Sequence, residues 1–521
     1  MKKIFQSFGA DLSASIVVLL VALPLCLGIA LASGAPAFSG IIAGIIGGIV
    51  VGVFSGSPLS VSGPAAGLTV IVAAAIVKLN TYDAFLLSIV LAGCLQLLLG
   101  YLKAGFIGDY IPNSVIKGML AAIGLILILK QLQHLVGYDN DFEGDLSFKQ
   151  TATNENTFSA LYHAIQSFTP TAVLIGAVSL FVLILWEHLS TKKESFFKFI
   201  PAPLLVVVIG ILINEYFIAN NAVNTLSNKH LVNLPIATNT NEFLSFFSFP
   251  SIQHLNNPNV WITAFTLAIV ASLETLLGIE AVDKLDPYKR ISPPNAELKA
   301  QGIGNIVSGL IGGLPVTSVI VRSSANVSSG AKTKLATILH GILLLICVIF
   351  VPFVLNKIPL SALAAILIFT GYKLAKVELF KAFYNKGWDQ FVPFVATIAA
   401  ILLTDLLIGI VIGILVGLFF MIRSNFISAI MLVSNENNFM IRFRKDVSFL
   451  NKPILKKRLQ EIPDNSILII DVTHADFIDK DIIEEVNNYM LSAHQKNIKI
   501  DVKRNAHKSL HKLFKTQTNI E

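Results

Sequence analysis

The chain has 521 residues, of which 54% are hydrophobic and 14% charged, and its mean hydropathy is +0.72. Soluble domains carry about 25% charged residues, so a soluble protein this apolar could not cover its surface with polar groups. The formal net charge of +7 gathers at the ends of apolar runs and in the C-terminal tail, as in the loops of membrane proteins. The composition therefore argues against a nucleic-acid-binding protein and predicts a chain embedded in a lipid bilayer.

Apolar runs of about 20 residues predict membrane-spanning helices. Such runs occupy residues 13–32, 37–54, 83–102, 111–130, 168–187, 201–218, 259–281, 296–313, 333–355, 358–372, 388–405 and 406–423. Two shorter segments begin at a proline and occupy residues 64–78 and 315–328. The total of 14 transmembrane segments is even, so both termini lie on one side, and Lys2, Lys3 and Arg423 place that side in the cytoplasm. We expect a multi-pass protein of the cell's inner (plasma) membrane.

The character of the chain changes after Arg423. Residues 466–472 predict a buried strand, residues 480–495 carry apolar side chains at helical spacing, and residues 498–502 alternate like a second strand. Strand, helix and strand predict a small cytoplasmic α/β domain. The predicted domains are a polytopic α-helical membrane domain, residues 1–430, and a short α/β domain, residues 436–521.

The membrane part contains an internal repeat. Pro64 and Pro315 each open a short apolar segment and lie 251 positions apart. Pro112 and Pro359 each precede an Ala-Ala-Ile run and lie 247 positions apart. Two matched pairs at nearly one offset indicate two halves of seven segments, and an odd number per half inverts the second half. Inverted repeats with short, proline-interrupted helices are typical of transporters, which bind substrate at the interruption. In the alternative interpretation, these prolines merely kink two ordinary helices.

A helix that begins in mid-membrane leaves its first N–H groups without partners and places partial positive charge at that end. Two such ends facing each other could bind an anion without a fixed positive side chain. Small side chains after Pro64 would let an anion approach the backbone, and hydroxyls after Pro315 would donate hydrogen bonds. The predicted substrate-binding residues are Ala65, Ala66, Gly67, Thr69, Thr317, Ser318 and Val319.

Two ionisable residues lie inside the predicted spans. An acid within the membrane is a functional hypothesis by default, so Glu274 is predicted to hold a proton or to share a proton or cation with the transported anion. Arg322 is predicted to add positive potential behind the site. Both have a structural alternative, in which each forms an ion pair between helices, and the two residues could pair with each other.

The sequence offers no catalytic or metal-binding constellation. Cys26, Cys94 and Cys347 lie inside apolar runs without metal-ligand spacing, and His134 and His340 are far apart along the chain. We therefore predict no enzyme activity, no metal site and no cofactor. An anion channel and a sensor that signals through the C-terminal domain are further alternatives that the sequence leaves open.

Several motifs in the membrane part point to one family. They are Leu23-Pro24, Val61-Ser62-Gly63-Pro64, Ser272-Leu273-Glu274, and the run from Gln301-Gly302-Ile303-Gly304-Asn305 through Gly312-Gly313-Leu314-Pro315 and Arg322 to Asn326. These motifs resemble the sulfate permease (SulP) family of inorganic anion transporters, and the resemblance covers essentially the whole chain. The tail, with Val447-Ser448-Phe449-Leu450-Asn451-Lys452 and Phe477-Ile478-Asp479, is similar to a short STAS domain (sulfate transporter and anti-sigma-factor antagonist).

The resemblance implies a fold divided into a core and a gate, with the anion bound between the third and tenth segments. It also implies elevator-type alternating access, a homodimer, and a STAS domain at which a cytoplasmic regulator could bind. Glu274 resembles the carboxyl group of proton-coupled members, so proton symport of sulfate or bicarbonate is expected. Gly278 and Ala65 stand where sodium-coupled bicarbonate members have hydroxyl residues, which favours H⁺ over Na⁺. Sodium-dependent bicarbonate uptake and an uncoupled anion channel or exchanger are the alternatives.

Overall fold

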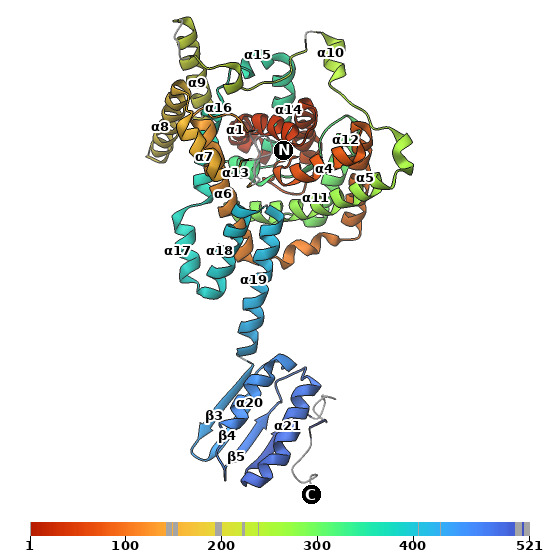
Figure 1. The fold of residues 1–521 in the computed structure, drawn as a ribbon, viewed down its shortest axis with the longest axis vertical. Coiled ribbons are helices and arrows are strands. Elements are labelled where there is room, and N and C mark those ends of the chain that lie inside the picture. Colours follow the sequence, from red (N-terminus) through yellow and green to blue (C-terminus); the bar gives the residue numbers. More distant parts are fainter. Residues whose placement is uncertain are drawn as a thin grey trace. The chain divides into compact units, whose positions relative to one another are not determined.

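The structure is a computed structural model that describes residues 2–141, 148, 155–192, 201–220, 225–237, 239–404, 406–427, 429–505 and 513–514. The chain divides into two compact units, Met1–Ile414 and Leu415–Glu521. Figure 1 shows that the first unit is built from helices and the second from helices and a sheet.

The first unit consists almost entirely of helices, the last of which continues past Ile414 into the second unit. In chain order they are α1 (Lys2–Ala32), α2 (Ala37–Ile46), α3 (Gly52–Phe54), α4 (Thr69–Leu79), α5 (Tyr82–Tyr101), α6 (Asn113–Leu135), α7 (Thr157–Gln166), α8 (Pro170–Lys192), α9 (Ala202–Ala219), α10 (Thr240–Ser245), α11 (Pro258–Leu285), α12 (Pro294–Leu310), α13 (Ile320–Ser328), α14 (Leu335–Phe350), α15 (Pro352–Leu355), α16 (Leu360–Leu374), α17 (Val377–Asn385), α18 (Trp388–Leu403) and α19 (Leu406–Ile427). Each predicted transmembrane range overlaps at least one of these helices.

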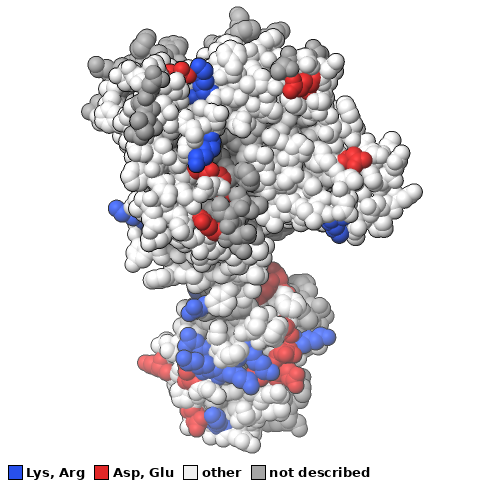
Figure 2. Space-filling view, turned by 45° about the horizontal axis from the view of Figure 1, so that its top comes forward, with Lys and Arg blue, Asp and Glu red and all other residues white. Residues whose placement is uncertain are grey.

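Length and composition identify membrane-spanning helices in the part of the chain that the structure describes. There, 9 helices are long and apolar enough to cross a membrane, and shorter apolar helices occupy Ala66–Leu79, Leu335–Phe350 and Trp388–Leu403. On the face drawn in Figure 2, Lys, Arg, Asp and Glu are sparse over the first unit and dense over the second. The first unit is therefore a polytopic helical membrane domain.

The helices of this unit form two groups by their contacts. In the first group, α5 packs against α11 and α12, and α1 packs against α2, α13 and α14. In the second group, α6 packs against α16 and α18, and α16 also packs against α8. At the α6–α16 crossing, a Cβ on Gly371 would lie 2.6 Å from the carbonyl oxygen of Gly124, so only glycine allows this approach. Gly124 and Gly371 are 247 positions apart, the offset of Pro112 and Pro359, as expected if equivalent residues of a repeat meet near a symmetry axis.

The two proline-led segments differ in detail from the prediction. Pro64 does not begin a helix: it ends strand β1 (Ser62–Pro64), and a 3-10 turn, Ala66–Leu68, precedes α4. Pro315 precedes strand β2 (Val316–Ser318), which leads into α13. The strands pair antiparallel, with Gly63 opposite Thr317. The alternative of two kinked but continuous helices is therefore wrong, because extended backbone interrupts both segments.

The second unit is a four-stranded sheet with two helices. Its strands are β3 (Ile430–Asn435), β4 (Asn438–Phe443), β5 (Ile467–Asp471) and β6 (Lys499–Lys503), in the order β3-β4-β5-β6. β3 and β4 are antiparallel, and the other neighbours are parallel. Helices α20 (Lys452–Gln460) and α21 (Lys480–Ala493) contact each other, and the apolar side of α21 is buried in the core of the unit. The predicted strand, helix and strand correspond to β5, α21 and β6, whereas the sequence interpretation missed β3, β4 and α20.

The connection between α9 and α11 is fastened to the second helix group by a buried carboxylate. Asp139, just after α6, accepts hydrogen bonds from Nδ1 of His134 and Nδ1 of His230, each at 2.6 Å, and its side chain is 3% exposed. Burial alone would raise the pKa of Asp139, but the hydrogen bonds and charges of the two histidines hold its pKa below the ordinary value. Folding therefore favours the ionised form of Asp139 over its protonated form.

Asp139 should consequently make the folded protein less stable as the pH falls into the acid range. A carboxyl group whose pKa is lowered by folding contributes stability above its unfolded pKa, about 3.9 for aspartate, and that contribution is lost as the pH falls through the lower folded value. We expect Asp139→Asn to lower the thermal midpoint at neutral pH, and the difference from wild type to shrink as the pH falls below about 4. Tryptophan fluorescence against temperature would measure it. The exposed Asp389→Asn variant is the control, and a difference for Asp139→Asn that persists at the lowest pH would contradict the prediction.

Candidate functional site

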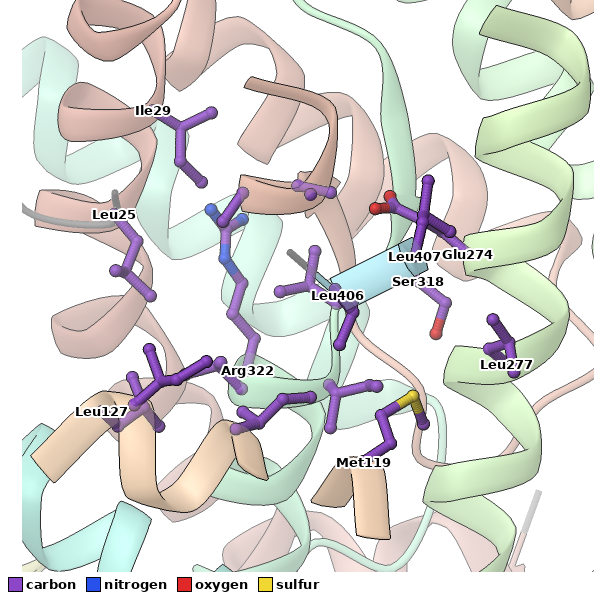
Figure 3. Close-up of a pocket in the computed structure, with 18 of the residues that line it drawn as sticks. Leu25, Ile29, Met119, Leu127, Glu274, Leu277, Ser318, Arg322, Leu406 and Leu407 are labelled. Atoms are coloured by element: carbon purple, nitrogen blue, oxygen red, sulfur yellow. The ribbon is translucent and has the colours of Figure 1, made fainter. Parts of the chain in front are cut away.

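A cavity of about 290 Å³ lies where the two interrupted segments meet. One side of it is formed by residues 65–67, which precede α4, by α11, and by β2 and the first turn of α13. The lining residues are Leu25, Ile29, Ala65, Ala66, Gly67, Val70, Ile71, Met119, Ile123, Ile126, Leu127, Glu274, Leu277, Ser318, Val319, Ile320, Val321, Arg322, Leu406, Leu407 and Ile408. Figure 3 shows Glu274, Ser318 and Leu277 on one side of it and Leu25 and Leu127 on the other.

Most of the residues predicted from the sequence come together here. Ala65, Ala66, Gly67, Ser318 and Val319 line the cavity, as do both ionisable residues predicted for the site. The other two predicted residues lie outside the lining. The hydroxyl of Thr69 is buried without a hydrogen-bond partner among the described residues, and the hydroxyl of Thr317 donates to Glu274 Oε2 at 3.4 Å.

The predicted donors after Pro315 are partly used by the protein itself. Thr317 and Ser318 lie in β2, not in the first turn of a helix as expected. The hydroxyls of Ser318 and Ser60 are 2.7 Å apart, and the N–H of Val319 donates to the carbonyl of Val61 at 2.9 Å. The N–H of Val319 is therefore not available to a ligand. Extended backbone replaces the predicted helix start because β1 and β2 satisfy each other's backbone groups.

The start of α13 supplies backbone donors to the cavity. Its N-cap, Val319, makes no side-chain capping bond, so Ile320 and Val321 begin the helix without a capping side chain. Both of these residues line the cavity. Because the first N–H groups of a helix have no intrahelical acceptor and carry partial positive charge, this end of α13 favours an anion.

Glu274 is a buried acid with an incomplete set of partners. It lies in the middle of α11, is 6% exposed, and accepts the long hydrogen bond from Thr317. Its Oε1 has no hydrogen-bond partner in the described part of the chain. A Cβ at Gly67, in the 3-10 turn before α4, would collide with this oxygen, so a larger residue there would force the Glu274 side chain to move. The carboxyl group therefore has one oxygen free to bind a proton, a cation or a ligand.

Arg322 is a buried cation that is not neutralised by Glu274. Its side chain is fully buried, and its Nη2 donates to Cys26 Sγ at 3.2 Å. Its Nε and Nη1 have no hydrogen-bond acceptor among the residues that the structure describes, and no ion pair with Glu274 is present there. Leaving a buried charge without a counter-charge costs several kcal/mol, so this geometry favours an anion nearby. The predicted alternative of a Glu274–Arg322 pair is wrong.

The apolar wall of the cavity was missed by sequence reasoning. Met119, Ile123 and Leu127 of α6 contribute to it, together with Leu406 and Leu407 at the start of α19. In the sequence, these side chains are indistinguishable from the apolar residues that face lipid elsewhere in the same spans. The pairing of Arg322 with Cys26 was also missed, because nothing in the sequence indicates that α1 and α13 meet at these positions.

Comparison with known sequences identifies the family. Residues 8–397 match the model of the Sulfate permease family. The chain belongs to this family. Among curated relatives, this Sulfate permease family member is 26% identical over 406 residues to the putative sulfate transporter YvdB of Bacillus subtilis, covering 77% of this chain and 71% of the relative. It is 27% identical over 409 residues to the bicarbonate transporter BicA of Synechocystis, covering 77% of this chain and 67% of that protein.

Solved structures share the fold. The transmembrane domain of a cyanobacterial bicarbonate transporter BicA superposes with a TM-score of 0.55 at 24% identity, covering 79% of this chain and 98% of that one. SLC26A9 superposes with a TM-score of 0.67 at 15% identity, covering 98% of this chain and 86% of that one. The chain therefore shares the fold of these transporters, and its membership of the Sulfate permease family makes it a membrane transporter and not an enzyme.

Proposed function

We propose that this protein is a secondary active transporter that binds one small oxyanion, sulfate or bicarbonate, in the cavity between the two helix groups, and couples its movement to protons. The observation that carries the proposal is the pair of unsatisfied buried groups in the cavity, Arg322 Nε and Nη1 and Glu274 Oε1. The relatives named above as sulfate and bicarbonate transporters support the same substrate class.

The anion would be held by charge and by backbone donors. Arg322 supplies two donor nitrogens that have no acceptor among the described residues, Nε and Nη1, and the first turn of α13 supplies partial positive charge. An ionised donor makes a stronger hydrogen bond than a neutral one, and a guanidinium suits a planar or tetrahedral oxyanion. Ala65, Ala66 and Gly67 offer backbone without bulky side chains on the opposite side. The apolar wall from α6 and α19 would exclude water from the bound ion.

Glu274 is proposed as the coupling residue. A carboxylate facing an anion would repel it, whereas a protonated carboxyl would donate a hydrogen bond to it, so anion and proton would bind together. Its free Oε1 is the atom at which the proton and the anion would meet. Na⁺ coupling has less support, because a sodium site needs several oxygen ligands and Gly278, one turn along α11, brings no side chain.

The transport cycle and assembly are proposed from the two helix groups and the family. The first group would be the moving core, and the second group with α19 would be the gate, in an elevator movement. We propose 14 transmembrane segments in two inverted repeats, with both termini in the cytoplasm and the protein in the inner (plasma) membrane. The membrane domain would end near residue 430, and residues 436–521 would form a short STAS domain where a regulator could bind. Two copies would form a homodimer.

Uptake into proteoliposomes tests the proposal. The purified protein would be reconstituted and given labelled sulfate or labelled bicarbonate, with or without an inward proton or sodium gradient. Saturable sulfate uptake that the proton gradient drives is the expected result. Bicarbonate uptake driven by sodium would overturn proton coupling and give Glu274 another role. Uptake that rises linearly with anion concentration and responds to neither the proton nor the sodium gradient would instead identify a channel.

A further inference from the structure

The amide of Asn305 pairs with the backbone of β2 as a neighbouring strand would. The N–H of Val316 donates to Asn305 Oδ1 at 2.6 Å, and Asn305 Nδ2 donates to the carbonyl of Val316 at 3.0 Å. In an antiparallel pair, alternate residues face the partner strand. The N–H of Val319 donates to Val61, the residue before β1, so the backbone groups of Val319 point toward β1. By the same alternation the N–H and carbonyl of Val316 point away from β1, and they would be unpaired without Asn305. Asn305 thus completes the outer edge of β2.

Asn305 is itself held by a second buried amide. Its Nδ2 also donates to Gln96 Oε1 at 2.6 Å, and Gln96 Nε2 donates to Ser272 Oγ at 3.3 Å. Asn305 is on α12, Gln96 on α5 and Ser272 on α11, and their exposed fractions are 1%, 0% and 6%. This amide relay, Asn305–Gln96–Ser272, fastens β2 to three helices. Ser272 lies two residues before Glu274 on the same helix.

The three residues of the amide relay do not line the cavity, but the strand that they hold, β2, carries groups that do. β2 carries Ser318 and leads directly into Val319 and the start of α13, all of which line the cavity. β2 also carries Thr317, whose hydroxyl reaches Glu274. A shift of β2 along α12 would move these groups relative to Glu274, while leaving the apolar wall and Arg322's partner on α1 in place.

We propose that Asn305, held by Gln96, is a positioning residue that sets the placement of β2 and the start of α13 against Glu274, and thereby the affinity for the anion. The proposal rests on the proposed function, because it concerns the same cavity. A purely structural role predicts a loss of folded protein with unchanged affinity in the protein that remains. A positioning role predicts weaker anion binding in protein that is correctly folded.

The test compares saturable uptake of labelled sulfate and of labelled bicarbonate by the full-length protein in proteoliposomes, normalised to the folded protein recovered by size-exclusion chromatography. Asn305→Ala removes both bonds to Val316. Gln96→Met removes the anchor of Asn305 and the bond to Ser272 but leaves the bonds of Asn305 to β2, so it should fold where Asn305→Ala fails. Both changes are neutral, so neither adds a charge near the anion. Ser308→Ala is the matched control, because its buried hydroxyl on α12 bonds the carbonyl of Leu314 at 2.7 Å, outside β2.

The expected result is a KM raised about tenfold by Asn305→Ala and about threefold by Gln96→Met, with turnover within about twofold of wild type and Ser308→Ala unchanged. An unchanged KM in folded Gln96→Met and Asn305→Ala would overturn the proposal, as would an equal rise in Ser308→Ala. Turnover that falls at constant KM would overturn it too, because the relay would then affect the conformational change of transport and not the binding of the anion in the cavity. If the wild-type protein takes up neither anion saturably, the proposed function fails, and this inference falls with it.

Discussion

Glu274→Gln is expected to abolish anion accumulation driven by a proton gradient while leaving anion exchange measurable. Glutamine has the shape of a protonated glutamate, so Gly67, Thr317 and the cavity can keep their places, but the amide cannot gain or lose a proton. A gradient of about one pH unit is worth about 1.4 kcal/mol per coupled proton, so the wild-type protein should concentrate sulfate about tenfold at that gradient. The variant should reach no accumulation, because its anion binding no longer depends on protons.

The experiment needs a second buried acid as its control. Glu297 on α12 is fully buried, accepts hydrogen bonds from Ser55 Oγ at 2.6 Å and Gln301 Nε2 at 3.1 Å, and does not line the cavity. Glu297→Gln should retain proton-driven accumulation. Both variants would be measured in the same proteoliposomes, with the membrane voltage clamped and with counterflow of labelled sulfate as the measure of exchange. Proton-driven accumulation that survives in Glu274→Gln would remove this residue from the coupling mechanism.

The broad features of the membrane unit could be predicted because lipid imposes a simple rule. Every backbone N–H and C=O group that faces hydrocarbon must be hydrogen-bonded within the helix. A membrane span is therefore a continuous apolar run of about 20 residues, which is easily recognised in a sequence. The interruptions at Pro64 and Pro315 could be located for the same reason, since proline and glycine break such runs. An acid in an apolar helix stands out equally well, which is why Glu274 could be assigned to the site before its surroundings were known.

The conformation at the interruptions could not be predicted. Residues 62–64 and 316–318 are too short to show the alternation of a strand, and their extended backbone depends on pairing between residues 252 to 256 positions apart in the sequence. The roles of Asn305 and Gln96 depend on that pairing, because their amides matter only once β2 exists. Tertiary contact, not local sequence, decides this part of the site.

The C-terminal unit shows the same limit in another form. β5 and α21 have clear patterns, and both were predicted. β3 and β4 form a hairpin whose connection contains Glu436 with a φ of 52°, a conformation that Asn or Gly normally signals. The connection is rich in Asn but lacks the Asn-Gly or Asp-Gly pair that marks a tight hairpin, and the hairpin was missed.

Arg322→Gln is the second large expected effect, and it acts on affinity. Hydrogen bonds to a charged group contribute about 1.5–3 kcal/mol, so losing the guanidinium should raise the KM for sulfate about 10- to 100-fold. The change is measured as the concentration dependence of labelled sulfate uptake per folded protein. Arg322→Lys keeps the charge but not the fork of donors, so it should lie between the two. Because Arg322 has no counter-charge among the described residues, removing it should not leave a buried acid unpaired, and the variant should fold.

A second arginine separates the local effect from the general effect of removing positive charge. Arg290 lies beyond the end of α11, where its Nε donates to Asp286 Oδ2 at 2.7 Å, and it does not line the cavity. Arg290→Gln therefore removes one positive charge from the protein without touching the site, and its KM should equal that of wild type. A KM that rises equally in both variants would mean that long-range potential guides the anion. A KM unchanged in Arg322→Gln would mean that the start of α13 and the backbone near Gly67 bind the anion without a fixed cation, because these are the remaining donors around the cavity.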